Sequence, residues 1–206
     1  AQSLAALEKE LGKEFGGVSN PLLVSVRSGA KFSMPGMMET VLNVGITPEV
    51  AAALAESSGN PRFAWDSYRR FIEMYGKIVC DVEPEEFHKV EHRVLSHRGV
   101  SSLQELEVED LISLAEGFIK VIEIATGETF PTDPREHLVA SIEAVFKSWN
   151  SERAQLYRRR ERIPSDFGTA VNIQSMVFGN LSDDSGTGVA FTRNPSTGEI
   201  GSYGDY

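Results

Sequence analysis

The spacing of apolar residues predicts helices over the middle of the chain. Thr47-Pro48-Glu49 has the order of an N-cap, a first-turn proline and a first-turn carboxylate, and this helix should end near Ser57–Asn60. Asp133-Pro134 gives the same signal for a later helix. The inward faces of the predicted helices are Leu4, Leu7 and Leu11; Ala64, Tyr68, Phe71, Ile72 and Tyr75; Phe87, Val90 and Val94; Leu111, Ala115, Phe118 and Ile122; and Leu138, Ile142, Val145 and Trp149.

The pattern changes near both ends of the chain. From Val171 to Phe178 apolar and polar residues alternate, as in a strand, and a second strand at 189–192 lies between turns at 182–186 and 194–198. We therefore predict an α+β fold. Its expected parts are an α+β subdomain formed by 1–46 and 132–178, a helical subdomain inserted at 47–131, and the start of a further lobe at 179–206.

The segment 22–39 connects a short apolar run to a glycine-bearing loop. Leu22–Val26 fits a buried strand, although so short a run also fits a helix. Arg27 follows, then a loop with glycines, and an apolar helix-like run begins at Met37. An arginine beside a glycine loop suits a polyphosphate, because the guanidinium is a charged fork and glycine admits close backbone approach. The alternative is a strand-to-helix turn that carries one surface arginine, since the segment matches neither common phosphate-loop motif.

Four stretches carry a resemblance to a known family, and they occur in the same order as in that family. They are Val26–Ala30 with Ser33–Thr40, Asn60–Phe71, Gly168–Asn180 and Ser185–Pro195. In amino-acid sequence they resemble the nucleotide-binding domain of the pyruvate phosphate dikinase family. The resemblance extends over nearly the whole chain.

This resemblance implies an ATP-grasp-like fold, truncated here, in which ATP is held between two α+β lobes. Arg27 matches an arginine that contacts the ATP phosphates and supports phosphoryl transfer, a role that a planar guanidinium fills better than a lysine. The other matched nucleotide-binding positions are Gly36 and Met38 over the nucleotide, Gln174, Met176 and Val177 at the adenine, and Thr187 and Gly188 in a second phosphate loop. Packing for Met38, a solvent-facing strand position for Gln174 and a hairpin turn at 185–188 are the structural alternatives.

The resemblance also implies a reaction and partners. In the family's full enzyme the β-phosphoryl of ATP passes, through a histidine on another domain, to pyruvate, giving phosphoenolpyruvate, AMP and diphosphate from ATP, phosphate and pyruvate. Mg²⁺ is needed, the phosphohistidine and pyruvate-binding domains belong to the same long chain, and the enzyme is a homo-oligomer. The catalytic lysine and the metal ligands would lie outside Ala1–Tyr206. We therefore expect a fragment that binds ATP weakly and is inactive alone. A phosphoenolpyruvate synthase-type dikinase and a docking module without nucleotide use are the alternatives.

Composition narrows the partners further. Thirty acidic and twenty basic residues give a net charge of −10, which disfavours a nucleic-acid surface but leaves a local phosphate site possible. Cys80 is the single cysteine, so no internal disulfide can form; we expect a small, packed thiol and a reducing, cytoplasmic location. No apolar run approaches membrane-spanning length, and no membrane partner is expected.

Two clusters have less specific interpretations. His88 and His92 are four residues apart and His97 is near, which could suit a metal, but the segment is not an H-E-x-x-H arrangement, and this favours a solvated helix face. None of these, nor His137, lies in the setting of the family's phosphorylated histidine. The basic run 158–162 is interpreted as a solvated helix end, or alternatively as a docking patch.

Overall fold

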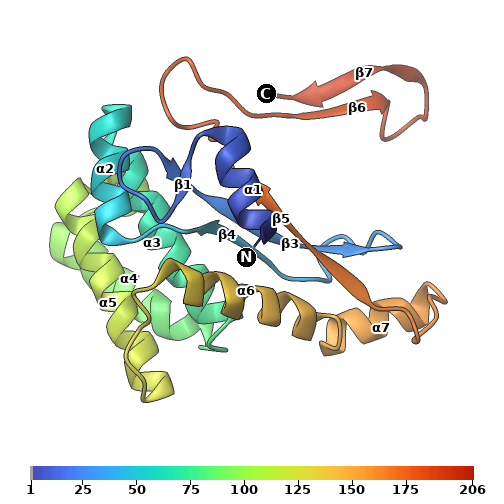
Figure 1. Cartoon of the computed structure of the whole chain (residues 1–206), viewed down its shortest axis with the longest axis horizontal. Coiled ribbons are helices and arrows are strands. Elements are labelled where there is room, and N and C mark those ends of the chain that lie inside the picture. Colours follow the sequence, from blue (N-terminus) through green and yellow to red (C-terminus); the bar gives the residue numbers. More distant parts are fainter. Residues whose placement is uncertain (1) are drawn as a thin grey trace. The chain divides into compact units, whose positions relative to one another are not determined.

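The computed structural model describes residues 2–206 and contains two compact units, one that ends at Met176 and one formed by Val177–Tyr206. The first unit mixes helices with short sheets (Figure 1). Its helices are α1 (Gln2–Leu11), α2 (Pro48–Ser58), α3 (Pro61–Ile78), α4 (Pro84–Arg98), the 3₁₀ turn η1 (Leu103–Glu105), α5 (Val108–Thr126), α6 (Pro134–Ser148) and α7 (Glu152–Arg160). Its strands are β1 (Glu14–Phe15), β2 (Pro21–Leu22), β3 (Val24–Ala30), β4 (Thr40–Val44) and β5 (Thr169–Ser175).

A three-stranded antiparallel sheet in the order β4-β3-β5 organises this unit, with β3 in the centre. Arg27 on β3 lies opposite Thr40 on β4 and Asn172 on β5, so these three residues form one row across the sheet. Directly opposed residues in a sheet point to the same face. Val24, Val26 and Val41, at other positions of the same strands, are fully buried. The sheet thus combines a buried apolar interior with a polar row centred on Arg27.

The helix expected from Met37 is wrong, because 35–37 form a turn and strand β4 follows from Thr40. The apolar residues Met37, Met38, Val41 and Val44 fit a helical face, but Thr40, Val41 and Val44 are β-branched and favour a pleated strand. Pairing with β3 decides between the two. A register shift between Val24 and Val26 is accommodated where Asn43 adopts a left-handed conformation, with φ of 58°.

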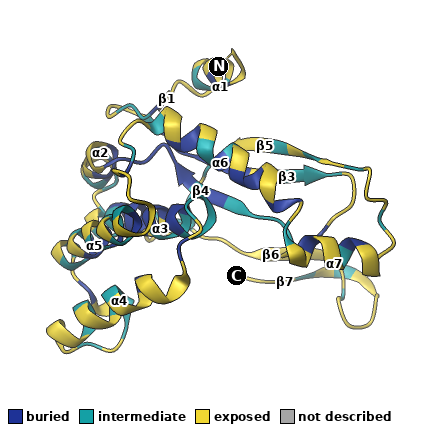
Figure 2. Cartoon of the chain, turned by 90° about the horizontal axis from the view of Figure 1, so that it is seen from below, coloured by how far each residue is buried: buried dark blue, intermediate teal, exposed yellow. Residues whose placement is uncertain are grey.

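The helices cover the sheet in two groups. Helix α3 contacts α2, α5 and β4, and α6 contacts β3, β4 and β5. Figure 2 shows the buried residues concentrated along α3, α6 and the sheet, while α4 is largely exposed. Phe87 is the buried residue of α4, and its ring meets that of Phe118 edge-on at 5.1 Å. The predicted helical insert at 47–131 corresponds to α2–α5, and its independence as a subdomain stays a prediction.

The second unit is a hairpin preceded by a loop. Strands β6 (Val189–Arg193) and β7 (Ile200–Asp205) pair antiparallel. The predicted turn at 194–198 is confirmed: the Asn194 side-chain oxygen accepts from the backbone N–H groups of Ser196 and Thr197 at 2.8 and 3.2 Å. None of the helices within residues 2–206 has both the length and the apolar character needed to cross a bilayer.

Candidate functional site

The loop between β3 and β4 encloses a cavity of about 450 Å³. Its wall is formed by residues 27–36 together with Met38 and Thr40. Three residues predicted to touch a nucleotide, Arg27, Gly36 and Met38, therefore lie on one hollow. The cavity is close in size to small-molecule sites in general.

Arg27 occupies the base of this loop with its side chain exposed. Across residues 2–206 no protein acceptor bonds its guanidinium, whereas its backbone is fixed between β4 and β5. A cation with a rigid backbone and no intramolecular partner is available for an anionic ligand. Lys31 also lines the cavity, with its ammonium 5.1 Å from the Phe167 ring centre. The sequence reasoning missed Lys31, although a second cation in the same loop was a readable signal.

The tip of the loop is a tight turn. The Met37 N–H donates to the Met34 carbonyl at 3.1 Å, with Pro35 and Gly36 between them. Proline at the second position and a residue with positive φ at the third are the requirements of a type II turn, and Gly36 has φ of 72°. A Cβ placed on Gly36 would meet no atom within 4 Å, so open space lies beside this backbone. The turn can therefore be approached closely by a ligand.

The α6–α7 corner holds the loop from behind. Met34 is buried in a cluster with Trp149 and Ala154, and Met38 packs against the same cluster. The Glu39 N–H donates to Ser148 Oγ at 3.1 Å, and the Glu39 carboxylate forms an ion pair with Arg153. Met38 accordingly lines the cavity and packs as well, so its two expected roles are compatible.

The predicted adenine residues lie along and just beyond β5. Gln174 is exposed and lies opposite Ser25 of β3, two residues along the strand from Arg27 and therefore on the same face of the sheet. Met176 extends the ladder through its N–H to the Leu23 carbonyl at 2.9 Å, and its sulfur accepts from the Asn43 N–H at 3.1 Å. Neither residue lines the loop cavity. The strand predicted to run as far as Phe178 ends earlier in the structure, because β5 ends at Ser175.

The remaining predicted residues belong to the second unit. Val177 is 92% exposed, and Thr187 and Gly188 are exposed immediately before β6. A Cβ on Gly188 would lie 2.6 Å from the Asp205 carbonyl oxygen, so close backbone packing alone requires glycine there. The alternative of a hairpin turn at 185–188 is wrong, since the turn that joins β6 and β7 lies at 194–198. A nucleotide cleft shared by Arg27 and Thr187 stays a prediction.

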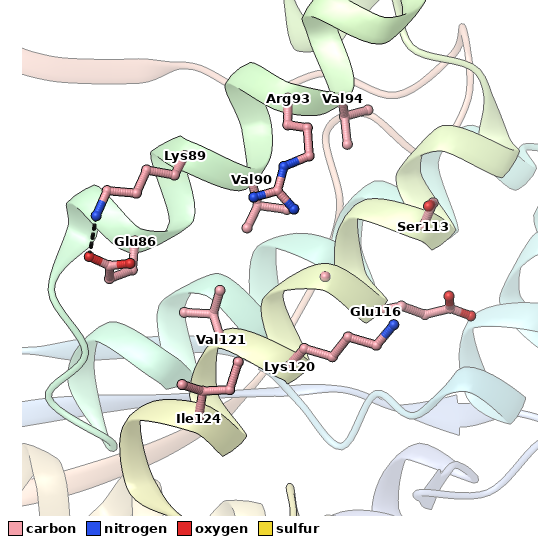
Figure 3. A pocket seen from close by; sticks show the side chains of 11 residues that line it. Glu86, Lys89, Val90, Arg93, Val94, Ser113, Glu116, Lys120, Val121 and Ile124 are labelled. Carbon is pink, nitrogen blue, oxygen red and sulfur yellow. Dashed lines mark hydrogen bonds and ion pairs between the residues drawn. The ribbon is translucent and has the colours of Figure 1, made fainter.

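Two other cavities contain none of the predicted residues. A groove of about 500 Å³ lies between α4 and α5, where Val90, Val121 and Ile124 contribute apolar side chains (Figure 3). Lys89, Arg93 and Lys120 lie around it, and Lys89 is paired with Glu86. A smaller cavity of about 250 Å³ is lined by apolar residues near Phe130 and His137. Both have mainly apolar walls, unlike the polar loop cavity.

The histidines and the cysteine lie outside the loop cavity, either exposed on α4 or packed against other residues. His88, His92 and His97 are exposed on α4, and no group of three potential metal ligands occurs within residues 2–206. His137 is buried among aromatic rings, and its Nε2 lies 2.7 Å from the Pro131 carbonyl oxygen. Cys80 is half-buried, and this burial raises its pKa to about 11, so the thiol stays protonated near neutral pH.

The basic run contains one exception to the predicted solvated helix end. Arg159 and Arg160 are exposed, but Arg158 is only 6% exposed. Its guanidinium carbon lies 4.1 Å from the Trp149 ring centre, and its Nη1 donates to the Trp149 carbonyl at 2.5 Å. The prediction fails for this residue because the turn between α6 and α7 brings Trp149 back over it.

A family model decides the relationship of the chain to known proteins. The model of the pyruvate phosphate dikinase AMP/ATP-binding domain matches residues 1–204. The chain belongs to this family. It is 52% identical over its full length to a pyruvate, phosphate dikinase of Clostridium symbiosum, of which it covers 24%. Over 98% of its length it is 50% identical to the Giardia intestinalis enzyme, covering 23% of it. Over its full length it is 48% identical to the chloroplastic enzyme 1 of Arabidopsis thaliana, covering 21%.

Membership of the dikinase AMP/ATP-binding family agrees with a kinase-type domain and confirms the resemblance found in the sequence. The chain spans about a quarter of the length of the curated dikinases it matches. Mixed helix and sheet structure is also as predicted.

Proposed function

We propose that the β3–β4 loop binds the phosphates of ATP, and that the chain is the ATP-binding part of a pyruvate, phosphate dikinase. One observation carries the proposal. In a member of an ATP-binding family, the Arg27 guanidinium has no protein partner in the described chain and lines a cavity with the Pro35-Gly36 turn. Such a cation beside an open backbone turn is chemically suited to phosphate.

Each loop residue has a distinct role in this proposal. Arg27 donates charge-assisted hydrogen bonds to phosphate oxygens, in the two-pronged geometry that guanidinium allows. Lys31 adds a mobile point charge at the same cavity, and Gly36 lets the ligand approach the turn. Phosphoryl transfer is accelerated mainly by positioned cations and donors, so these groups support transfer as well as binding.

The rest of the nucleotide would be bound in an ATP-grasp arrangement. Gln174, Met176 and Val177 would line the adenine, with the Gln174 amide able both to donate and to accept. Thr187 and Gly188 would contribute a hydroxyl and a bare backbone to phosphate oxygens.

The complete reaction requires parts beyond this chain. In the proposed scheme the β-phosphoryl of ATP moves to a histidine on another domain and then to pyruvate, while inorganic phosphate takes the γ-phosphoryl, leaving AMP, diphosphate and phosphoenolpyruvate. Mg²⁺ would neutralise phosphate charge, but the loop cavity contains no carboxylate and residues 2–206 hold no three-ligand cluster. The isolated chain is expected to bind ATP weakly without turnover.

A thermal-shift titration with ATP tests the proposal. A ligand at 100 times its Kd stabilises a protein by about 2.7 kcal/mol, so the unmodified protein should melt at a higher temperature with ATP. Arg27→Ala should lose most of this shift and keep its melting temperature without ATP, because Arg27 has no intramolecular partner. Arg93→Ala, at the α4–α5 groove, is the matched control and should retain the shift. An equal ATP shift in all three proteins would refute the assignment of Arg27.

The alternatives make different predictions in the same assay. A docking module would show no ATP shift in any variant. A phosphoenolpyruvate synthase-type enzyme would show the same Arg27 dependence, but the full-length protein would form product with water in place of phosphate. The three relatives named above are pyruvate, phosphate dikinases, which favours the phosphate-dependent reaction.

A further inference from the structure

The α6–α7 corner contains a buried cation without an anionic partner. Arg158 is 6% exposed, and none of the ion pairs found among residues 2–206 includes it. Its Nε atom is buried and has no hydrogen-bond partner. An unpaired charge is unfavourable in a protein interior unless other contacts compensate. Here the compensating contacts converge on a single residue, Trp149.

Arg158 holds Trp149 through both its ring and its backbone. The guanidinium carbon is 4.1 Å from the ring centre, within the range of a cation–π contact. Nη1 donates to the Trp149 carbonyl at 2.5 Å. That carbonyl belongs to the C-cap residue of α6, so the contact also fixes the path from α6 into α7. The orientation of the indole is therefore set by Arg158.

The fixed indole is the surface on which the β3–β4 loop rests. Trp149 and Ala154 enclose Met34, which is 7% exposed, and Ala30, Met37 and Met38 pack against this cluster. Met34 is the first residue of the Pro35-Gly36 turn, and its carbonyl accepts the hydrogen bond that closes the turn. The same loop lines the 450 Å³ cavity, and Met34 and Met38 take part in both the cavity wall and the corner cluster.

We propose that Arg158 is a positioning residue for the phosphate loop. By clamping Trp149 it holds Met34, and thereby presents the turn in its binding conformation before the nucleotide arrives. This inference rests on the proposed function of the loop and extends it to a residue that touches no ligand. Preorganisation of this kind raises affinity because less loop ordering is required on binding.

Hydrogen exchange and ligand affinity distinguish a positioning role of Arg158 from a merely structural one. Arg158→Met keeps an apolar stem of similar length but removes the cation and the hydrogen bond. In the intact protein without nucleotide, backbone amides of residues 31–39 should exchange hydrogen faster, while those of α3 stay protected. ATP affinity should fall about tenfold, the scale expected when a loop has to be ordered on binding, and adenosine affinity should change less than twofold. Arg159→Met, at the exposed neighbouring position, should change neither quantity.

Two further variants keep the test decisive. Arg158→Lys retains the charge but loses the planar stacking, and it should show a partial increase in loop exchange. Met34→Ala removes the contact from the loop side and leaves α6 and α7 unaltered; it should reproduce the loop exchange and the ATP defect even if Arg158→Met does not fold. Unchanged exchange of 31–39 in a folded Arg158→Met, or in Met34→Ala, overturns the proposal.

Failure of the proposed function gives a separate result. If the loop does not bind phosphates, Arg27→Ala will leave ATP binding unchanged, whereas loop exchange in Arg158→Met will still rise. If only the positioning role of Arg158 is wrong, Arg27→Ala will weaken ATP binding. Arg158→Met will then leave both loop exchange and ATP affinity unchanged.

Discussion

Replacing Gly36 by alanine tests whether the conformation of the Pro35-Gly36 turn matters for nucleotide binding. Gly36 has φ of 72°, a left-handed conformation that disfavours an L side chain by about 1–2 kcal/mol. The added methyl meets no atom within 4 Å, so the effect is conformational and not steric. Pro35 and Gly36 are exposed while Met34 is anchored, so the free loop can relax into an unstrained form.

In Gly36→Ala this conformational free-energy penalty then lowers ATP affinity, because ATP binding requires the turn to form again. A penalty of 1–2 kcal/mol corresponds to a loss of affinity of about 5- to 30-fold. Isothermal titration calorimetry of ATP against the intact protein measures this directly. The unfolding free energy should change little, because the relaxed loop carries no strain.

Gly59→Ala is the matched control. Gly59 has φ of 65° at the C-cap of α2, and a Cβ there also meets no atom within 4 Å. The backbone penalty is the same in kind but lies outside the loop, so Gly59→Ala should lower the unfolding free energy and leave ATP affinity unchanged. ATP affinity of Gly36→Ala within twofold of the unmodified protein would refute this role of the turn.

Two further predictions concern the helical part of the unit. Phe87→Ala removes the buried contact of α4 and should lower the unfolding free energy by about 3–5 kcal/mol. Backbone amides of 84–98 should then exchange hydrogen quickly, while ATP binding is unaffected. Preserved protection of α4 would contradict this prediction. Burial lowers the pKa of His137 below its ordinary value of 6.5, so the unfolded chain takes up the proton first and stability is lost as pH falls below about 6.5. Urea unfolding at pH 7.5 and 5.5 should therefore show a larger acid loss for the unmodified protein than for His137→Gln, and equal losses would exclude this effect.

The helix starts were predictable from the sequence because their determinants are local. Thr47 Oγ1 accepts from the Val50 N–H at 3.3 Å, and the Asp133 carboxylate accepts from the Arg135 N–H at 2.8 Å. In both cases the cap and the groups it satisfies are within three residues of each other. A short motif is then sufficient to specify the structure.

Strand β4 was not predictable in the same way. Met37, Met38, Val41 and Val44 are compatible with either a helix or a strand when considered alone. The pairing of Thr40 with Arg27 and of Val41 with Val26 selects the strand. That choice also places Arg27 in the centre of a sheet, which gives it a fixed backbone.

The amino-acid sequence by itself determined the starts of α2 and α6, the family and Arg27 as a candidate phosphate ligand, since short motifs and collinear sequence matches encode them. Only the tertiary structure decided that the loop rests on the α6–α7 corner and that Arg158 is buried. Glu39 and Arg153, which join the loop to this corner, are 114 residues apart in the chain. Contacts over such separations depend on how the whole unit packs, and no local pattern of residues specifies them.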